Sequence, residues 1–341
     1  MLLRLVKIFI DLINLCYSKD MITFFHRNLK AGYSINKVTQ TIVSSIYEKE
    51  EYFMPHAGAS IYDLLCNLFF TYKHRNKSGI NHVTGDVHYV IISLIGCKTV
   101  LTIHDTVLLD YHHFPLLKRV IVEWLWFRIP LKFATKVVCI SEQTRKSVQK
   151  YTRRNDIEVI HNAVDPSFKR YKKDDFHNQI LFIGTNPNKN LERSFEALKG
   201  LQCHISIIGK LSPSQIDSLR INKISYENKV GLSDSELIEE YKRTDLISFI
   251  SLFEGFGMPI VEANAIGRPV ITSNIPVLNE VANNSAVFVN PYDINDIRDG
   301  YKEILTNKAL REEIVKKGLI NAERFNAKRI VKEWKRLYEA I

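Results

Sequence analysis

Short apolar runs alternate with segments of helical periodicity along almost the whole chain. The runs predicted as strands in the first half are Met21–Phe25, Tyr52–Pro55, Ile80–Val83, Thr99–Ile103, Lys136–Ile140 and Ile157–Ile160. The helical pattern between them predicts helices over Ile35–Tyr47, Ile61–Lys73, Val87–Ile95, Leu116–Phe133 and Glu142–Tyr151. Alternation of this kind favours a parallel sheet covered by helices on both faces. The first half is therefore predicted to be a doubly wound α/β domain.

The same alternation restarts after the charged stretch Lys169–Asp175, which we interpret as a linker. Strands are predicted at Ile180–Ile183, His204–Ile208, Leu246–Ile250, Pro269–Thr272 and Ala286–Val289. Helices are predicted at Leu191–Ala197, Ser233–Lys242, Pro259–Ala265, Ile294–Thr306 and Ala309–Phe325. A length of 341 residues suits two such domains, 1–168 and 169–326. Ligands are expected in a cleft at the carboxyl ends of the strands. The closing helix, 327–341, is a candidate to cross back onto the first domain.

Charge and cysteine content narrow the class of partner and the compartment. The formal net charge is +10, and ten Lys/Arg stand against two acids between Lys118 and Arg154, which favours anionic partners. The five cysteines are far apart and form no C-x-x-C pair, as expected of reduced thiols in a cytoplasmic protein. Arg4, Lys7 and Asp11 interrupt the apolar N-terminus, so an amphipathic helix is predicted there, with packing on the domain favoured over membrane contact.

The stretch FEGFGMPIVEANAIGRPV, residues 253–270, is the most specific feature of the second half. It follows a buried strand and continues into a turn containing Gly255 and Gly257. Pro259 suits the first position of a helix, and Gly267 suits the position just past its end. The N-terminus of this short helix would offer free N–H groups and the positive end of a dipole, so it predicts an anion site.

Two glutamates flank that turn. Glu262 is predicted in the first turn of the helix, where its carboxylate could accept hydrogen bonds from the vicinal hydroxyls of a ribose. Glu254 precedes the turn and should face the same cleft. Either acid alone is better explained as a helix-stabilising or solvated residue. The pair, with glycines between, favours a functional role.

A nicotinamide dinucleotide site is the main alternative for this turn. Such a site needs G-x-G-x-x-G and an acid at the end of the next strand. The turn reads GFGMPI without the third glycine, and the next strand ends at TSN without an acid. The dinucleotide site is therefore disfavoured.

A second candidate segment is ILFIGTNPNKNL, in which a strand ends at Gly184 and a helix starts near Asn190. Lys189 would place an ammonium at the helix entrance, where it could bind a diphosphate. A P-loop is excluded because G-x-x-x-x-G-K-[ST] is missing. Taken singly, Lys189 would more often be a solvated surface lysine.

Two strand ends of the first half carry histidines. His104 ends a strand in TVLTIHDTVLLD, where it could bond a substrate hydroxyl, move a proton or serve a structural role. The turn HVTGDVHYV contains His82, Asp86 and His88. Two histidines suggest a metal, but no third ligand is evident, so acceptor contact or helix capping by Asp86 is favoured.

Together these segments resemble the retaining, nucleotide-sugar-dependent glycosyltransferases of family 4, also called glycosyl transferase group 1, which have the GT-B fold. The E-x7-E motif is met by Glu254 and Glu262. Further similar segments, from about Thr99 onward, are IHD, VVCISEQTRKSV, IHNAVD, ILFIGTNPNKNL, IIGK and VGLSDSELIEEYKRTD. The resemblance implies two Rossmann-like domains facing a central cleft, with 1–168 binding the acceptor and 169–326 the nucleotide sugar.

The resemblance also implies roles for individual residues. Glu262 would hold the nucleotide ribose and Glu254 the hydroxyls of the donor sugar. Lys189 would neutralise the leaving diphosphate, and His104 would lie near the donor sugar. The remaining donor-binding candidates are Gly184, Thr185, Asn190, Gly255, Phe256 and Gly257, and the acceptor-binding candidates are His82, Asp86 and His88.

Two positions depart from the family pattern. Many relatives carry arginine where this chain has Thr185, and often another where it has Asn188. The predicted diphosphate site is thus less cationic, which increases the importance of Lys189. The resemblance implies no cofactor and no bound metal.

The resulting hypothesis is a retaining transferase that moves a hexose from a UDP- or GDP-sugar to a glycan or a polyprenyl-diphosphate-linked acceptor in surface polysaccharide synthesis. The alternatives are a GT-B enzyme of the nucleotide-sugar epimerase type and a nucleic-acid-binding protein, the latter suggested by charge alone and not expected. We expect a cytoplasmic enzyme at the inner face of the plasma membrane. In Leu116–Phe133, cations alternate with Trp124, Trp126 and Phe127. This pattern has two interpretations: the segment contacts an anionic membrane or a lipid diphosphate, or its aromatic residues belong to the core and its charges are solvated.

Overall fold

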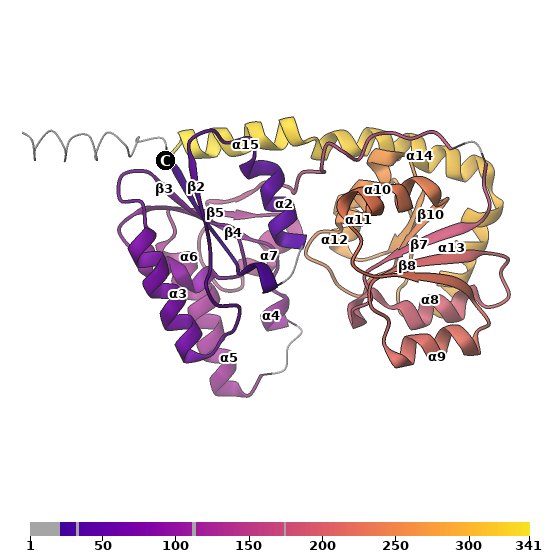
Figure 1. Cartoon of the computed structure of the whole chain (residues 1–341), viewed down its shortest axis with the longest axis horizontal. Coiled ribbons are helices and arrows are strands. Elements are labelled where there is room, and N and C mark those ends of the chain that lie inside the picture. Colours follow the sequence, from indigo (N-terminus) through magenta and orange to yellow (C-terminus); the bar gives the residue numbers. More distant parts are fainter. Residues whose placement is uncertain (1–20, 32–33, 111–113, 174) are drawn as a thin grey trace, which may run out of the picture. The chain divides into compact units, whose positions relative to one another are not determined.

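The computed structural model describes residues 21–31, 34–110, 114–173 and 175–341 (Figure 1). The chain forms two compact units. The first unit comprises the chain up to Asn162 together with Ile330–Ile341, and the second unit comprises Ala163–Arg329. The predicted N-terminal amphipathic helix lies outside the described residues.

The first unit contains a six-stranded sheet in which every neighbouring pair is parallel. Its strand order is β2 (Lys49–Phe53), β1 (Ile22–His26), β3 (Ile80–Val83), β4 (Lys98–Ile103), β5 (Lys136–Cys139) and β6 (Ile157–Val159). The helical segments are η1 (Leu29–Ala31), α2 (Ser34–Val43), α3 (Ile61–His74), η2 (His88–Leu94), α4 (Val107–Asp110), α5 (Leu116–Val122), η3 (Glu123–Arg128), α6 (Ile129–Phe133) and α7 (Glu142–Val148). The central strands are buried on both faces because helices cover both.

The second unit repeats this architecture with a second parallel six-stranded sheet. Its order is β12 (Val287–Val289), β11 (Val270–Ser273), β10 (Leu246–Phe249), β7 (Gln179–Ile183), β8 (His204–Ile208) and β9 (Ser225–Lys229). The helical segments are η4 (Pro187–Lys189), α8 (Leu191–Leu198), α9 (Pro213–Ile221), α10 (Asp234–Arg243), α11 (Met258–Ile266), α12 (Pro276–Ala282), α13 (Ile294–Thr306), α14 (Lys308–Ala322) and η5 (Glu323–Phe325). The last helix, α15 (Ala327–Glu339), begins in the second unit and belongs to the first unit from Ile330 onward. The predicted pair of doubly wound α/β domains is confirmed.

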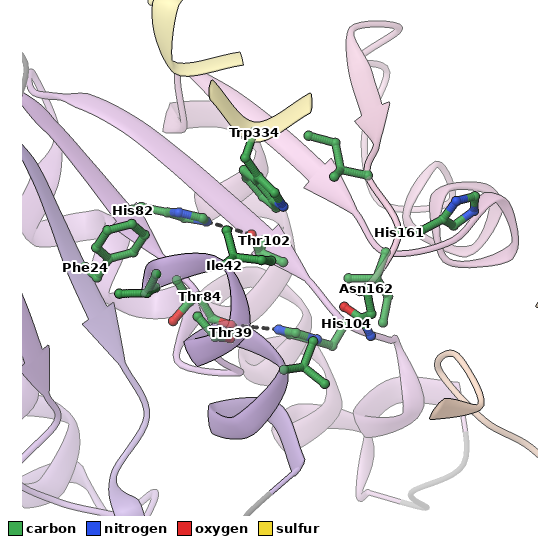
Figure 2. A pocket seen from close by; sticks show the side chains of 14 residues that line it. Phe24, Thr39, Ile42, His82, Thr84, Thr102, His104, His161, Asn162 and Trp334 are labelled. Carbon is green, nitrogen blue, oxygen red and sulfur yellow. Dashed lines mark hydrogen bonds between the residues drawn. The ribbon is translucent and has the colours of Figure 1, made fainter. Parts of the chain in front are cut away.

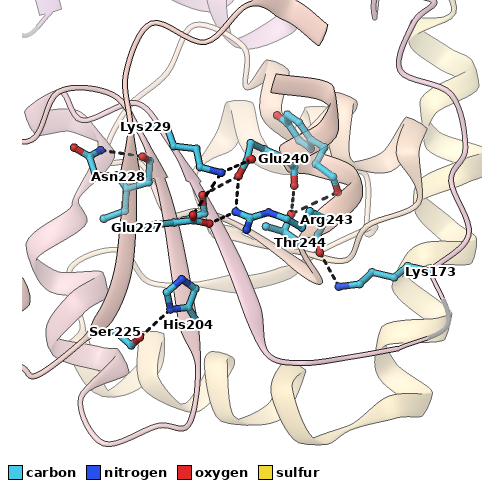
Figure 3. A network of polar contacts seen from close by, with 12 residues as sticks. Lys173, His204, Ser225, Glu227, Asn228, Lys229, Glu240, Arg243 and Thr244 are labelled. Carbon is cyan, nitrogen blue, oxygen red and sulfur yellow. Dashed lines mark hydrogen bonds and ion pairs between the residues drawn. The ribbon is translucent and has the colours of Figure 1, made fainter. Parts of the chain in front are cut away.

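The strand β9 was missed from sequence because its residues, SYENK, contain no apolar run. It is an edge strand, and ion pairs attach it to α10 (Figure 3). Arg243 bonds both Glu227 and Glu240, and Lys229 Nζ lies 2.5 Å from Glu240 Oε1. The short helices α9 and α12 were also missed.

Both sheets reverse their winding at an identifiable place. In the first sheet this point lies between β1 and β3, and in the second it lies between β10 and β7. Loops that leave the carboxyl ends of two such strands run to opposite faces of the sheet and leave a crevice between them. These two edges are therefore where ligand sites are expected.

The C-terminal helix α15 contributes side chains to the interior of the first unit (Figure 2). The two ring nitrogens of His82, on β3, lie 2.8 Å from the Tyr338 hydroxyl and 2.7 Å from Thr102 Oγ1. The His82 ring also stacks near Trp334, with 4.9 Å between ring centroids. A cavity of about 20 Å³ beside these rings has room for about one water.

The charged segment predicted as a linker is bound to the second unit. The Tyr171 N–H donates to the Ile266 carbonyl at 3.0 Å, and the Tyr171 carbonyl accepts from Arg268 Nη1. Lys173 pairs with the buried carboxylate of Asp245. A low apolar content indicated a linker, but the polar groups of the segment are used in hydrogen bonds.

Candidate functional site

Lys189 and Glu254 form an ion pair at the switch point of the second sheet. Lys189 follows β7 and Glu254 follows β10, and these two strands are neighbours. Lys189 Nζ lies 2.5 Å from Glu254 Oε1 and 4.4 Å from the centre of the Phe249 ring. Both side chains are more than four-fifths buried. The two residues predicted to act on the donor are therefore brought together.

Asn188 joins the same two loops. Its side-chain amide donates to Glu254 Oε1 at 3.2 Å and to the Phe253 carbonyl at 3.1 Å. Its own carbonyl accepts from the Leu252 N–H at 2.8 Å. A neutral side chain at this position thus orients Glu254 and leaves Lys189 as its cationic partner. The sequence showed Asn188 only as a departure from the family pattern.

The other candidates after β7 are part of the same loop. Gly184 has φ +85°, and a Cβ there would lie 3.1 Å from Lys189 Cε, so glycine lets the lysine fold back over the backbone. Thr185 Oγ1 donates to the Lys210 carbonyl at 2.8 Å. Asn190 is buried, and its amide donates to the Pro291 carbonyl at 2.7 Å. The Asn190 side chain is therefore used within the protein.

The glycine turn before α11 differs in detail from the prediction. The helix starts at Met258, so Pro259 is its second residue and Glu262 lies beyond the first turn. Gly257 has φ +112°, and a Cβ there would meet Leu278 at 2.8 Å, so glycine is required. Gly267, at φ +84°, ends the helix as predicted. Gly255 lies in the loop just before the turn.

The side chain of Phe256 is buried against Phe325, with 5.6 Å between ring centroids. The group that it can offer to a ligand is therefore its backbone. Its predicted part in donor binding would therefore fall to its backbone N–H.

Glu262 is held by a residue that the sequence did not indicate. The hydroxyl of Tyr241, on α10, donates to Glu262 Oε2 at 2.5 Å. Tyr241 is fully buried, and burial together with the neighbouring carboxylate raises its pKa well above the usual value, so it remains a donor. Because α10 and α11 are neighbours only in the folded sheet, no local pattern could have revealed this pair.

The first unit has a pocket of about 400 Å³ at its own switch point. It is lined by residues that follow β1, β2, β3 and β4, among them Arg27, His56, Asp86, His88 and His104. Arg27 Nη1 lies 3.6 Å from Asp86 Oδ2, and its buried Nε has no hydrogen-bond partner among the described residues. The structure thus brings three of the predicted residues, Asp86, His88 and His104, to one pocket and adds Arg27.

The tautomer of His104 follows from its partner. Its Nε2 lies 2.7 Å from the Thr84 carbonyl, which can only accept, so Nε2 carries the proton (Figure 2). Burial lowers the pKa of His104 to about 4, so the ring is neutral near pH 7 and its Nδ1 is an acceptor. His88 donates from Nδ1 to the Trp126 carbonyl at 2.9 Å in the same way, and burial lowers its pKa.

His82 does not line this pocket. Both its nitrogens are bonded in the interior, to Thr102 and Tyr338, and burial lowers its pKa well below the usual value. The structure therefore gives His82 a place in the core, where sequence analysis had grouped it with Asp86 and His88. Among the described residues, no group of three His, Cys, Asp or Glu is arranged to hold a metal ion.

The buried histidines predict how stability depends on pH. His26 and His104 each have a pKa of about 4 in the folded chain, against an ordinary value of 6.5. Between these pH values the unfolded chain binds protons that the folded chain does not, so the free energy of unfolding falls as the pH falls from 6.5 to 4. Each histidine contributes a slope of up to about 1.4 kcal/mol per pH unit.

All three tryptophans, Trp124, Trp126 and Trp334, belong to the first unit, so their fluorescence during urea unfolding reports on it. The free energy of unfolding of His104→Gln is expected to fall less steeply with falling pH than that of the wild type. Parallel pH profiles of the two proteins would show that His104 does not carry this linkage.

Comparison with known proteins agrees with this architecture. The family model described as glycosyl transferases group 1 matches residues 164–319, and the one described as glycosyltransferase family 4 matches residues 78–168. The O-antigen chain mannosyltransferase RfbU of Salmonella typhimurium is 29% identical over 54% of this chain, and the match spans 56% of that protein. The O-antigen chain mannosyltransferase B of Escherichia coli is 23% identical over 82% of this chain and 70% of its own length.

Two solved structures show the same fold at low identity. The sucrose-phosphate synthase of Thermosynechococcus elongatus superimposes with a TM-score of 0.78 at 15% identity, covering 94% of this chain and 98% of that one. The Anabaena HepE protein in complex with UDP-glucose gives a TM-score of 0.75 at 13% identity, covering 94% of this chain and 100% of that one.

Proposed function

Since the chain belongs to the family 4 glycosyltransferases and has the GT-B fold, we propose that it moves a hexose from a UDP- or GDP-sugar to a glycan or lipid-linked acceptor with retention of configuration. The observation that carries this proposal is the largely buried ion pair of Lys189 and Glu254 at the switch point of the second sheet. A cation, a carboxylate and a glycine turn at that edge match the chemistry of a sugar diphosphate.

In this proposal, binding of the donor separates Lys189 from Glu254 and gives each of them a new partner. The diphosphate takes Glu254's place beside Lys189, and the freed carboxylate accepts hydrogen bonds from hydroxyls of the donor sugar. Asn188, which bonds Glu254 and the Phe253 carbonyl, keeps the carboxylate from turning away. Glu262, oriented by Tyr241, accepts from the hydroxyls of the ribose. The Lys189–Glu254 pair thus keeps both groups positioned before the donor arrives.

The reaction breaks the bond between the sugar C1 and the diphosphate oxygen. The electron pair of that bond goes to the leaving diphosphate, whose growing charge Lys189 and the nearby helix N–H groups stabilise. The acceptor oxygen bonds to C1 on the same face, and its proton passes to an oxygen of the leaving diphosphate. The configuration at C1 is kept, and no covalent intermediate on the protein is needed.

We assign the acceptor to the pocket of the first unit. A volume of about 400 Å³ is within the usual range for small-molecule sites. Arg27 offers a guanidinium with a spare donor, Asp86 a half-exposed carboxylate, and His104 a neutral Nδ1 acceptor. These groups suit a hydroxyl-rich acceptor with an anionic part, such as a glycan carried on a lipid diphosphate.

The relatives suggest the first sugar to test. Two of them are named as O-antigen chain mannosyltransferases, and a structural neighbour was solved with UDP-glucose. We therefore place mannose and glucose first among the hexoses, and surface polysaccharide synthesis as the process. We further propose that the enzyme works in the cytoplasm at the inner face of the plasma membrane, without a cofactor or bound metal.

A thermal-shift screen against UDP-, GDP- and ADP-sugars tests the proposal and identifies the base. One nucleotide class is expected to raise the melting temperature more than the others. Incubating that donor with lipid-linked oligosaccharide acceptors should yield a glycoside whose anomeric configuration, read by NMR, equals that of the donor.

Three outcomes would contradict the proposal. An inverted anomer would reject the retaining mechanism. Conversion of the donor to its epimer without transfer would favour the epimerase alternative. A screen with no stabilising nucleotide sugar would remove the transferase hypothesis and favour a binding protein.

A further inference from the structure

Helix α3 (Ile61–His74) is apolar on its outward side as well as on its inward side. On the inward side Leu64, Leu68 and Phe70 pack against the core of the first unit. The two fully buried residues, Asn67 and Thr71, are satisfied inside: Asn67 bonds the Tyr89 hydroxyl at 2.7 Å and the His56 backbone, and Thr71 donates to the Asn67 carbonyl. A soluble surface helix normally has a polar outward side.

The outward side of α3 is apolar too. Five large side chains there are more than half exposed, at a spacing that places them along one face: Ile61, Tyr62, Leu65, Phe69 and Tyr72. Phe69, for example, is 70% exposed. A stripe of this length on one helix indicates that the face is covered by something apolar when the protein functions.

Helix α5 (Leu116–Val122) also has an exposed apolar side. Val122 is its one buried residue. The opposite side carries Leu116, Leu117, Val120 and Ile121, of which Leu116 is 80% exposed. The segment continues into η3 with Trp124, which is also half exposed. The π-helical turns of η3 alter the helical phase, so Lys118 and Lys132 do not share a face as a regular helix would predict.

Helix α3 and the segment that follows α5 share a supporting element. Both α3 and the η3–α6 segment pack against η2, and α5 leads directly into η3. We call the outward residues of α3 together with those of α5 and Trp124 the apolar–basic face. Ten of the large exposed side chains of the described residues belong to it: Ile61, Tyr62, Leu65, Phe69, Tyr72, Leu116, Leu117, Val120, Ile121 and Trp124.

The charges around this face are mainly positive. Segments 61–77 and 114–133 contain seven Lys/Arg and two acids. Both acids have partners within the protein: Asp63 Oδ1 lies 3.0 Å from His56 Nδ1, and Glu123 Oε1 lies 2.5 Å from Arg128 Nε. Exposed Lys73, Lys118 and Arg119 therefore add positive charge at the edges of the apolar residues.

We propose that the apolar–basic face docks the enzyme on the surface of an anionic lipid bilayer. The apolar side chains enter the boundary between headgroups and acyl chains, and the lysine side chains reach back to lipid phosphates. Within the described residues no helix is long and apolar enough to span a bilayer, so the contact is peripheral. The apolar side chains project from the two helices with cations beside them. A fluid bilayer can surround side chains that project in this way.

Vesicle co-sedimentation of the full chain tests this docking. The wild type is expected to bind vesicles of phosphatidylglycerol and phosphatidylcholine, and to bind phosphatidylcholine vesicles much less. Leu65→Glu/Phe69→Glu and Leu117→Glu/Ile121→Glu should each weaken partitioning about tenfold or more, because they place charge where apolar contact is needed. All four side chains are solvent-exposed, so folding should be unaffected.

A matched control is available on the second unit. Ile216→Glu/Ile221→Glu adds the same charge on α9, where both residues are also exposed, and should bind vesicles as the wild type does. When the wild type binds vesicles, the fluorescence emission of Trp124 should shift to the blue and be quenched by brominated lipids. Comparison with Trp124→Phe assigns this emission to Trp124.

Any one of three results would overturn the proposal. Unchanged vesicle binding by both α3 and α5 variants would show that another part of the chain meets the lipid. Failure of the wild type to bind acidic vesicles would reject a membrane partner. If sedimentation showed a wild-type dimer that these substitutions dissociate, the face would instead be an interface between two copies.

Discussion

Replacing Lys189 with alanine is expected to lower kcat of sugar transfer by about 100- to 1,000-fold, the usual cost of removing one donor that stabilises charge in a transition state. Asn188, the other side chain that bonds Glu254, is neutral and cannot replace the charge of Lys189. The loss should be mainly in kcat, because the charge on the diphosphate grows as the C1–O bond breaks. Steady-state kinetics with the donor found by the thermal-shift screen measures it.

Two variants serve as controls for Lys189→Ala. Lys189→Arg keeps a cation next to Glu254 and should recover part of the rate. Lys316→Ala removes an exposed lysine of α14 in the same unit and should leave kcat unchanged. A Lys189→Ala enzyme with wild-type kcat and an intact melting temperature would refute the leaving-group role.

Replacing Glu262 with alanine is expected to raise the Kd of the nucleoside diphosphate by about 10- to 100-fold, since hydrogen bonds to a charged group contribute about 1.5–3 kcal/mol. The loss should be specific to the ribose. Wild-type protein should bind a 2′,3′-dideoxynucleoside diphosphate more weakly than the normal nucleotide, and Glu262→Ala should bind the two alike. Isothermal titration calorimetry with both ligands makes the comparison.

Tyr241→Phe should have a smaller effect than Glu262→Ala. It keeps the Glu262 carboxylate but removes the hydroxyl that donates to it at 2.5 Å, so discrimination between the two nucleotides should be reduced but not lost. The matched control is Tyr301→Phe, which removes another buried hydroxyl, 2.6 Å from Ser248, in the core of the same unit. Full ribose discrimination in Glu262→Ala would show that this carboxylate does not hold the ribose.

Local patterns were enough to predict the fold. The predicted strands Ile80–Val83 and His204–Ile208 have those same bounds in the structure, because a strand covered on both faces is rich in apolar residues even where single polar side chains interrupt it. The glycine that ends α11 was also predictable, since a left-handed residue there favours glycine. Strand β9 was missed because an edge strand can be polar when ion pairs attach it to a helix.

The residue types of the donor site were readable in the sequence, but their partners were not. Lys189 and Glu254 are 65 residues apart in the chain, and they meet because β7 and β10 are neighbours where the winding of the sheet reverses. Tyr241 reaches Glu262 from a different helix, and His82, which looked like a turn residue, is bonded to Tyr338 near the far end of the chain.

The order of polar and apolar residues therefore decides which segments become strands and helices, because each must bury one face or two. Which strands are adjacent decides which side chains share an edge of a sheet, and no local pattern contains that information. Helix α3 shows the same division: its periodicity predicted a helix, and only the packed structure revealed that Asn67 is buried while Phe69 is exposed.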